Sequence, residues 1–255
     1  RWHDAVRCGL PITVTDPDDV WTQDGVDHFQ VNDTTGNDGN AGTVAAPWKT
    51  MTKALSATGI FSVASARLTV AGNNAYAKTT DATLSNKAGP YLIEWDGVGT
   101  EPVIQLSSAV PCFTLASTAV GIRMVDIDIV GTDDQVGINL GNDCLFLRCS
   151  IDSVSGGFYI SGGLRTGTGV VECTVGTSVV QYSCYTETPY KCCFIGNNFD
   201  SGGASGEYTM RGYPSHCYAG HNRLNGGGAG KGTLRWSGYY PTGHGSRNGY
   251  EPTEW

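Results

Sequence analysis

The sequence predicts an all-β solenoid in which short parallel strands stack coil upon coil. Three observations lead to this fold class: low charge with abundant glycine, segments that alternate apolar and polar residues, and a nearly constant interval between those segments. Charged residues make up 16% of the 255 residues, and 36 residues are glycine, whereas an average soluble domain is about 25% charged and about 7% glycine. This composition disfavours helical bundles and coiled coils. The steady supply of apolar residues disfavours disorder.

The chain is expected to form one solenoid domain with an extension at each end. Residues 1–28 carry scattered acidic side chains and are predicted to be an N-terminal arm. The solenoid is predicted to cover residues 29–240. Residues 241–255 follow the last alternating segment and are predicted to be a C-terminal tail.

A short capping helix is predicted near residues 47–58, ahead of the first regular coil. Pro47 suits the first turn of a helix. An apolar stripe follows at helical spacing, formed by Trp48, Met51 and Leu55. The terminal unit of a solenoid exposes its core and must be capped, so this stripe is expected to bury against the open end of the first coil.

Strands are predicted wherever apolar and polar residues alternate, because a strand with one buried face has a period of two. Four irregular segments come first: residues 66–71, 91–95, 103–106 and 112–116. Five regular segments follow: residues 125–129, 147–151, 171–175, 195–199 and 220–224. The last residues of these five are separated by steps of 22, 24, 24 and 25 residues. In the first four, the first, third and fifth residues are predicted to point into the core.

A second strand is predicted after each regular segment. These strands are residues 137–140, 157–160, 179–182, 207–210 and 233–236. Strands this short and few cannot form independent sheets. Each is therefore expected to stack on the same strand of the next coil, as in a solenoid.

Two columns of like residues support stacked coils. One column holds Ile127, Cys149, Cys173, Asn197 and Asn222. The other holds Ile122, Cys144, Thr168, Cys192 and Cys217. Because neighbouring strands lie about 4.8 Å apart, Asn197 and Asn222 are expected to share hydrogen bonds with each other or with the backbone. Stacked cysteines at this spacing suit either a ladder of thiols or disulfides.

Residues 32–55 resemble the segment that leads into the solenoid in proteins of the pectate-lyase-like superfamily. The likeness consists of a Gly/Asp/Asn turn, then Gly42-Thr43, then Pro47-Trp48-Lys49-Thr50 before a helix. The resemblance implies a single-stranded right-handed parallel β-helix. In the polysaccharide-processing members it also implies a substrate groove along one exposed strand face.

In this chain the groove would lie on the second strand of each coil. The outward column there is predicted to be Asn139, Tyr159, Gln181, Thr209 and Arg235, with Arg211 two residues beyond Thr209. Arg211 and Arg235 would lie on neighbouring coils, and arginine suits bidentate recognition of a sugar carboxylate. β-Elimination also needs groups that accept and donate protons, for which Lys231, His216 and Tyr159 are candidates. The alternative is that these cations merely solvate a glycine-rich surface.

The signatures of particular enzymes are incomplete. Residues 211–216 resemble the Arg-x-Pro-x-x-Arg element of pectate lyases, but the proline is displaced and His216 replaces the second arginine. Asp133-Asp134 and Gly243-His244-Gly245 resemble motifs of pectin hydrolases, yet they are four coils apart rather than adjacent. Neither a cofactor nor a metal is expected, because the spacing of Cys192, Cys193, His216, Cys217 and His221 matches no usual zinc signature.

The charge balance disfavours nucleic acid as a partner. Lysine and arginine number 16 against 24 aspartates and glutamates, which gives a net charge of −8 without a basic cluster. No apolar run reaches the roughly 18 residues of a membrane span. Nine cysteines and a glycosylation sequon at Asn32 favour an oxidising compartment. An extracellular or virion-surface location is therefore expected.

Two classes of function fit these features. One is a secreted carbohydrate-active protein that binds or cleaves a polysaccharide, an acidic one if the arginines bind it, and that could be a polysaccharide lyase. The other is a structural or adhesive protein, such as a phage or virion appendage or an extracellular filament subunit, in which the solenoid serves as a rigid rod. For the second class we expect a homo-oligomer or attachment to a larger assembly.

Overall fold

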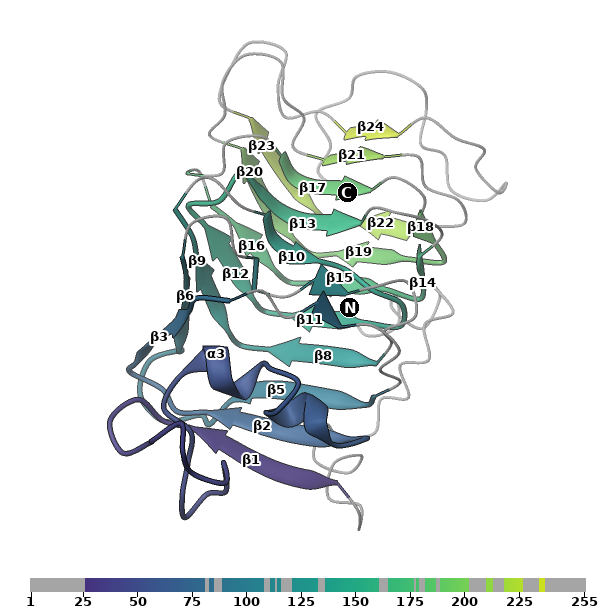
Figure 1. The fold of residues 1–255 in the computed structure, drawn as a ribbon. Coiled ribbons are helices and arrows are strands. Elements are labelled where there is room, and N and C mark those ends of the chain that lie inside the picture. Colours follow the sequence, from purple (N-terminus) through teal and green to yellow (C-terminus); the bar gives the residue numbers. More distant parts are fainter. Residues whose placement is uncertain are drawn as a thin grey trace.

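The computed structural model describes residues 26–80, 83–84, 89–107, 111–112, 114–115, 121–132, 136–160, 165–176, 178, 182–186, 189–201, 210–212, 218–226 and 234–236. In this part of the chain nearly all regular structure is parallel β-sheet, and the strands rise in stacked coils (Figure 1). A typical coil places one strand in each of three sheets. We call these the first, second and third sheet, in the order in which the chain enters them. The protein is a β-solenoid, as the repeats predict.

The first sheet has eight strands in the described residues, all paired in parallel. They are β1 (Asp27–Val31), β2 (Ala66–Val70), β5 (Tyr91–Trp95), β8 (Ile122–Val125), β11 (Leu145–Leu147), β15 (Gly169–Val171), β19 (Cys193–Ile195) and β22 (Tyr218–Gly220). The predicted strands at 66–71 and 91–95 are confirmed as members of this sheet.

The second and third sheets each have seven strands among the described residues. The second sheet contains β3 (Ala75–Lys78), β6 (Val103–Leu106), β9 (Asp128–Val130), β12 (Ser150–Asp152), β16 (Thr174–Val175), β20 (Asn198–Ser201) and β23 (Arg223–Gly226). The third sheet contains β4 (Thr83–Leu84), β7 (Thr114–Leu115), β10 (Val136–Asn139), β13 (Gly156–Ile160), β17 (Tyr182–Thr186), β21 (Met210–Gly212) and β24 (Leu234–Trp236). A small two-stranded sheet joins β14 (Arg165–Thr166) to β18 (Pro189–Tyr190).

A single residue in the left-handed region turns the chain from the first sheet into the second. In five successive coils this residue has φ between 51° and 65°. It is Asp126, Arg148, Glu172, Gly196 and His221 in turn. Each predicted five-residue strand at these places therefore spans a corner and contributes to two sheets. Alternation continues on both sides of the corner, so the sequence pattern does not reveal the turn.

Because of the corner, the first residue of these segments does not share the inward direction that was predicted for it. Met124 belongs to the core cluster, so Val125 beside it lies on the opposite, outer face of the first sheet. The predicted inward placement is wrong at Val125 and Val171, which are only half-buried. Leu147 and Ile195 are buried but lie outside the contiguous core cluster. The third and fifth residues of the segments at 125–129, 147–151, 171–175 and 195–199 are all buried, as predicted.

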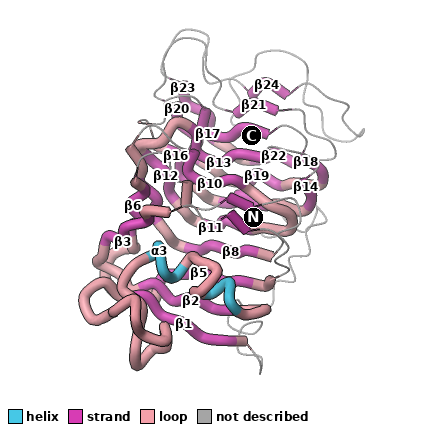
Figure 2. The backbone as a smooth tube through the Cα atoms, viewed as in Figure 1, coloured by secondary structure: helices cyan, strands magenta, loops and turns pink. Residues whose placement is uncertain are grey.

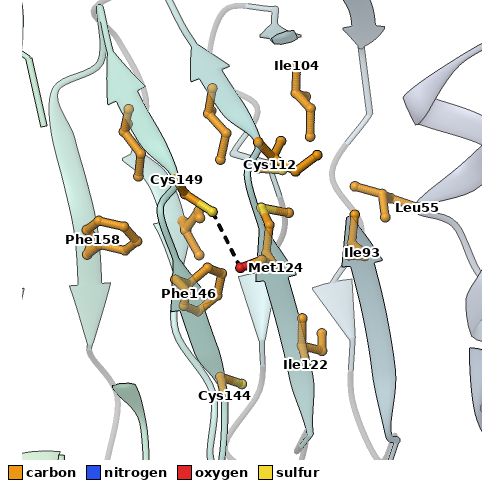
Figure 3. Close-up of a cluster of buried hydrophobic side chains, with 14 of the residues drawn as sticks. Leu55, Ile93, Ile104, Cys112, Ile122, Met124, Cys144, Phe146, Cys149 and Phe158 are labelled. Atoms are coloured by element: carbon orange, nitrogen blue, oxygen red, sulfur yellow. Dashed lines mark hydrogen bonds between the residues drawn. The ribbon is translucent and has the colours of Figure 1, made fainter. Parts of the chain in front are cut away.

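The core consists of columns of like side chains on successive coils. Figure 3 shows Ile93, Met124 and Phe146 on neighbouring strands of the first sheet, and their backbone register aligns them. At the corner, the Cys149 thiol donates to the carbonyl oxygen of Met124 across 3.5 Å (Figure 3). Cys149 and Cys173 are free thiols, which favours the thiol ladder over disulfides in this column.

The asparagine pair at the top of this corner column is confirmed. The Asn197 side-chain amide donates to Asn222 Oδ1 at 2.9 Å and to the carbonyl of Val170 at 2.9 Å. Asn197 Oδ1 accepts from the backbone N–H of Cys173 at 2.8 Å. Because both amides are buried, these bonds satisfy polar groups that would otherwise have no water to bind.

The capping helix is present but shorter than predicted. Helix α3 spans Met51–Ala54, and a 3-10 turn, η1, spans Ile60–Ser62 (Figure 2). Thr50 is the N-cap, so Pro47 does not form the first helical turn. Trp48 instead forms a parallel bridge with Val31 at the edge of β1. The predicted apolar stripe is nevertheless buried at Trp48, Met51 and Leu55, where it covers the end of the core.

Candidate functional site

One column of residues runs along the third sheet across six strands. The parallel register aligns Thr114, Asn139, Tyr159, Tyr185, Arg211 and Arg235. The strands β10, β13, β17, β21 and β24, which carry all but the first of these residues, rise one above another in Figure 1. Phe158 and Cys184 point into the core, so their neighbours Tyr159 and Tyr185 lie on the outer face.

This register brings Arg211 and Arg235 onto neighbouring strands and into the same column as Tyr159. The predicted column is wrong at two places, because Tyr185 and Arg211 stand where Gln181 and Thr209 were expected. The cause is the varying length of the connection from the second sheet to the third. It runs from Asp152 to Gly156 in one coil and from Val175 to Tyr182 in the next. Lys231 and His216 lie outside the described residues.

Three tyrosines form a cluster on the outer face of β13 and β17. The rings of Tyr159 and Tyr185 are stacked, with centroids 5.1 Å apart and planes inclined by 19°. Tyr182 completes the cluster, with its centroid 5.7 Å from that of Tyr159 and 5.2 Å from that of Tyr185. All three residues are half-buried, so the cluster borders solvent. We call it the tyrosine cluster.

The local sequence explains how two residues at an odd spacing share one face. Strict alternation would place Tyr182 and Tyr185 on opposite faces. In β17, however, both Ser183 and Cys184 are buried, and the Ser183 hydroxyl donates to the carbonyl of Asp200 at 2.7 Å. This interruption of the alternation lets both tyrosines face outward. Sequence reasoning missed Tyr182 and Tyr185 as site residues because it placed the second strand of this coil at residues 179–182, whereas β17 spans Tyr182–Thr186.

Asparagine and threonine extend the column below the tyrosines. The Asn139 amide donates to Thr114 Oγ1 at 3.3 Å. Of the six residues in the column, none is a carboxylate or an imidazole. The column therefore offers hydrogen-bonding groups, aromatic faces and two arginines, which suit binding of a polar chain that also carries negative charge.

Burial makes three of the cysteines poor candidates for a nucleophile. Burial raises the pKa of the Cys112 and Cys144 thiols to about 12, and it also raises the pKa of the Cys184 thiol on β17. A thiol that stays protonated is a poor nucleophile. Among the described residues there is no group of three or more histidine, cysteine or acidic side chains placed to hold a metal. Within the same residues, no helix is long and apolar enough to cross a membrane.

The comparisons with known proteins bear on the fold. No family model matches the chain, and no curated protein matches it by sequence. Among solved structures, the chain is similar to one titled rhamnogalacturonan lyase, with a TM-score of 0.53 and 15% sequence identity. The match covers 84% of this chain and 62% of that structure, so the chain spans less than two thirds of its length. At this identity the likeness shows the fold alone, which is a parallel β-helix.

Proposed function

We propose that the protein binds a polysaccharide along the outer face of the third sheet, with Arg211 and Arg235 contacting carboxylates of the sugar chain. The observation that carries this proposal is the unbroken register that puts both arginines in line with Tyr159 and Tyr185. Strands in one sheet are about 4.8 Å apart, so a single extended chain parallel to the solenoid axis can contact several of these residues. The similar structure titled rhamnogalacturonan lyase supports the same ligand class.

Binding is better supported than cleavage. β-Elimination needs a base for the C5 proton and an acid for the leaving oxygen. Within the column, Tyr159 and Tyr185 are the groups with an exchangeable phenolic proton. We propose that any lyase activity depends on Tyr159 together with Lys231 or His216. We also propose that the protein acts outside the cell or on a virion surface, where it would encounter polysaccharides.

Conservative arginine variants test the proposed binding site. In Arg211→Lys and Arg235→Lys the charge remains but the planar fork is lost, so affinity for a uronate oligosaccharide should fall roughly tenfold for each bidentate contact that is removed. Isothermal titration calorimetry measures this change. In the same samples, elimination is measured by the ultraviolet absorbance of the unsaturated product that it releases.

A matched control comes from the corner between the first and second sheets. Arg148 forms an ion pair with Asp126 there, with Nε 2.6 Å from Oδ1. Arg148→Lys makes the same chemical change away from the third sheet and should leave affinity unchanged. Equal affinity in the wild type, Arg211→Lys and Arg235→Lys would remove the binding site from these residues.

The second candidate function is a rigid structural or adhesive rod. The observation that favours it is the core, whose buried columns and asparagine pair link successive coils regardless of what the outer face binds. Under this alternative the wild type binds none of the polysaccharides tested. Sedimentation velocity would then show a homo-oligomer or assembly with other chains.

A further inference from the structure

We infer that the outer face of the first sheet is a docking surface for residues 1–25 of the same chain, which lie outside the described residues. The docking surface is an apolar column on β8, β11, β15 and β19, which follow one another in the first sheet (Figure 1). The parallel register aligns its members, which are Val125, Leu147, Val171 and Ile195. We call them the outer stripe. This surface is on a different sheet from the proposed polysaccharide site, so neither proposal depends on the other.

The outer stripe faces away from the core. In each of the four strands the residue before the stripe belongs to the core cluster, and alternation directs the stripe residue to the opposite face. In the three preceding coils the same column is polar and holds Gln30, Thr69 and Glu94. The column therefore changes from polar to apolar at Val125. A contiguous apolar patch on an outer face is typical of a surface that another segment covers.

The burial of two stripe residues points to such a cover. Leu147 is 6% exposed and Ile195 is 1% exposed. Their place beside the corner does not explain this, because Val125 and Val171 have the same place and are half-buried. A neighbour in the sheet does not explain it for Ile195 either, since its register partner on β22 is Gly220, which has no side chain. A segment lying over the sheet accounts for the burial.

The sequence of residues 1–25 suits this position. Leu10, Ile12 and Val14 alternate with proline and threonine, so an extended chain would present three apolar side chains on one face. Pro11 favours extended backbone but cannot donate a hydrogen bond to a neighbouring strand. The segment therefore suits packing over a sheet better than pairing within one. Residues 241–255, at the other end of the chain, contain no such alternating apolar segment.

The lengths of the segment and of the outer stripe agree. In an extended chain, Leu10 and Val14 would be about 13 Å apart. Val125 and Ile195 are separated by three strand spacings, or about 14 Å. The chain also enters the first sheet directly at β1, three strands before β8. Residues 15–26 can span up to about 40 Å when extended, so they can bring Val14 to Val125.

The charges of the two surfaces are complementary. Asp16, Asp18 and Asp19 follow the apolar residues of the segment. Arg123 lies on β8 two residues before Val125, and therefore on the same outer face. If Val14 packs on Val125, the aspartates would lie on the side of the stripe nearest the entry of the chain, where Arg123 is also found. Opposite charges at the end of an apolar contact would fix the direction of the segment.

Photo-crosslinking of the full chain tests the contact. A benzoylphenylalanine in place of Ile12 should, after irradiation, be joined to peptides that contain β11, β15 or β19, as identified by mass spectrometry. The crosslinked product should have the mass of one chain. The same group in place of Thr13 is the matched control. Alternation would direct it away from the sheet, so it should give several-fold fewer of these crosslinks.

Charged substitutions test the packing. Ile12→Asp should release the segment, so that trypsin cuts after Arg7 at least about tenfold faster. Binding of the dye ANS should increase because the outer stripe becomes exposed. Val171→Asp changes the stripe itself and should accelerate the same cleavage. Its control is Val44→Asp, because Val44 is 68% exposed and lies outside the stripe. This control should be cut as the wild type is.

Ile12→Asp leaves the solenoid sequence intact, so the test holds even if Val171→Asp unfolds the protein. Crosslinks from position 12 to other parts of the chain, equal yields from positions 12 and 13, or unchanged cleavage in Ile12→Asp would overturn the inference. A crosslinked product with the mass of two chains would assign the outer stripe to a second copy and would overturn it too. None of these measurements involves an oligosaccharide, so their failure would leave the proposed function standing.

Discussion

At the scale of single residues, the corner column contributes hydrogen bonds to stability as well as buried apolar surface. Asn197 and Asn222 repeat one arrangement on successive coils: each accepts a backbone N–H from the coil below and donates to a backbone carbonyl there. Cys149 and Cys173 occupy the same column lower down, where their thiols lie 3.3–3.5 Å from backbone carbonyls. Polar side chains thus occupy an interior position because the corner presents backbone groups that need partners.

Asn197→Leu should therefore destabilise the protein although leucine is more apolar. The change removes the partners of the Cys173 N–H and the Val170 carbonyl, and each buried group left unsatisfied costs about 1–3 kcal/mol. We expect the free energy of unfolding to fall by at least about 2 kcal/mol in a denaturant titration. Thr174→Ala, at an exposed position of the coil below, is the control and should change stability little. An unchanged midpoint for Asn197→Leu would mean that the corner tolerates unpaired groups.

The buried thiols predict a loss of stability at alkaline pH. Burial raises the pKa of Cys112 and of Cys144 from 9.0 to about 12. Between these values the unfolded chain releases thiol protons that the folded protein keeps, so the unfolded state binds fewer protons and the free energy of unfolding falls as pH rises. Below pH 9 this contribution is fully present. Chemical denaturation at pH 8 and pH 10.5 measures the fall, which should be smaller in a variant with both cysteines replaced by alanine.

At the scale of elements, the sequence predicts some strands better than others for a physical reason. In these coils one residue in the left-handed region joins the first sheet to the second, so the number of residues between the two strands is constant. Cys149 and Cys173 therefore hold the same place in successive coils, and their column can be identified from the sequence. The connection to the third sheet varies in length from coil to coil, so the strand at Tyr182–Thr186 begins later than predicted. The candidate site lies on that sheet. Its arginines could be identified by type, but Tyr185 could be aligned with them only by the structure.

The cap depends on one aspartate that sequence reasoning did not single out. Asp38 Oδ1 accepts the backbone N–H groups of Lys49 and Thr50, both at 2.9 Å, and Oδ2 accepts the Thr50 hydroxyl at 2.8 Å. Thr50 in turn caps α3 by accepting the N–H of Lys53. Asp38 therefore fixes the chain where it changes from the turn to the helix.

Asp38→Ala should lower the free energy of unfolding by about 1–2 kcal/mol, the usual cost of losing a helix cap and its charged hydrogen bonds. Thermal unfolding followed by circular dichroism measures the change. Asp33→Ala is a matched control, because the Asp33 carboxylate accepts the hydroxyl of its neighbour Thr34 in the exposed part of the same turn. A larger loss in Asp33→Ala than in Asp38→Ala would show that the turn, rather than the helix start, determines the stability of the cap.

At the scale of the whole molecule, stacking makes the solenoid a nearly one-dimensional structure. Each coil contacts mainly the coils above and below it, through parallel strands and through columns such as Ile93, Met124 and Phe146. The same stacking aligns outward residues at a fixed spacing, which is why the column from Thr114 to Arg235 follows the axis. The fold thus provides a linear surface that suits the proposed linear ligand, and the side chains on that surface would decide what it binds.

For an acidic sugar chain, the net charge of the molecule and the proposed arginine contacts predict that salt raises both rate constants, with opposite effects on affinity. At low ionic strength the charge of −8 repels such a chain at long range. Added salt shortens the screening length to about 10 Å at 0.1 M, so the association rate constant should rise. Salt would also weaken the proposed contacts between carboxylates and Arg211 or Arg235, so the dissociation rate constant should rise as well. Stopped-flow measurements with a uronate oligosaccharide between 0.02 M and 0.3 M salt, roughly the range over which screening changes most, can separate the effects on association and on dissociation. A neutral oligosaccharide of equal length should show neither effect. An association rate constant that falls with salt would mean that the arginine end of the column, rather than the net charge, steers the approach of the ligand.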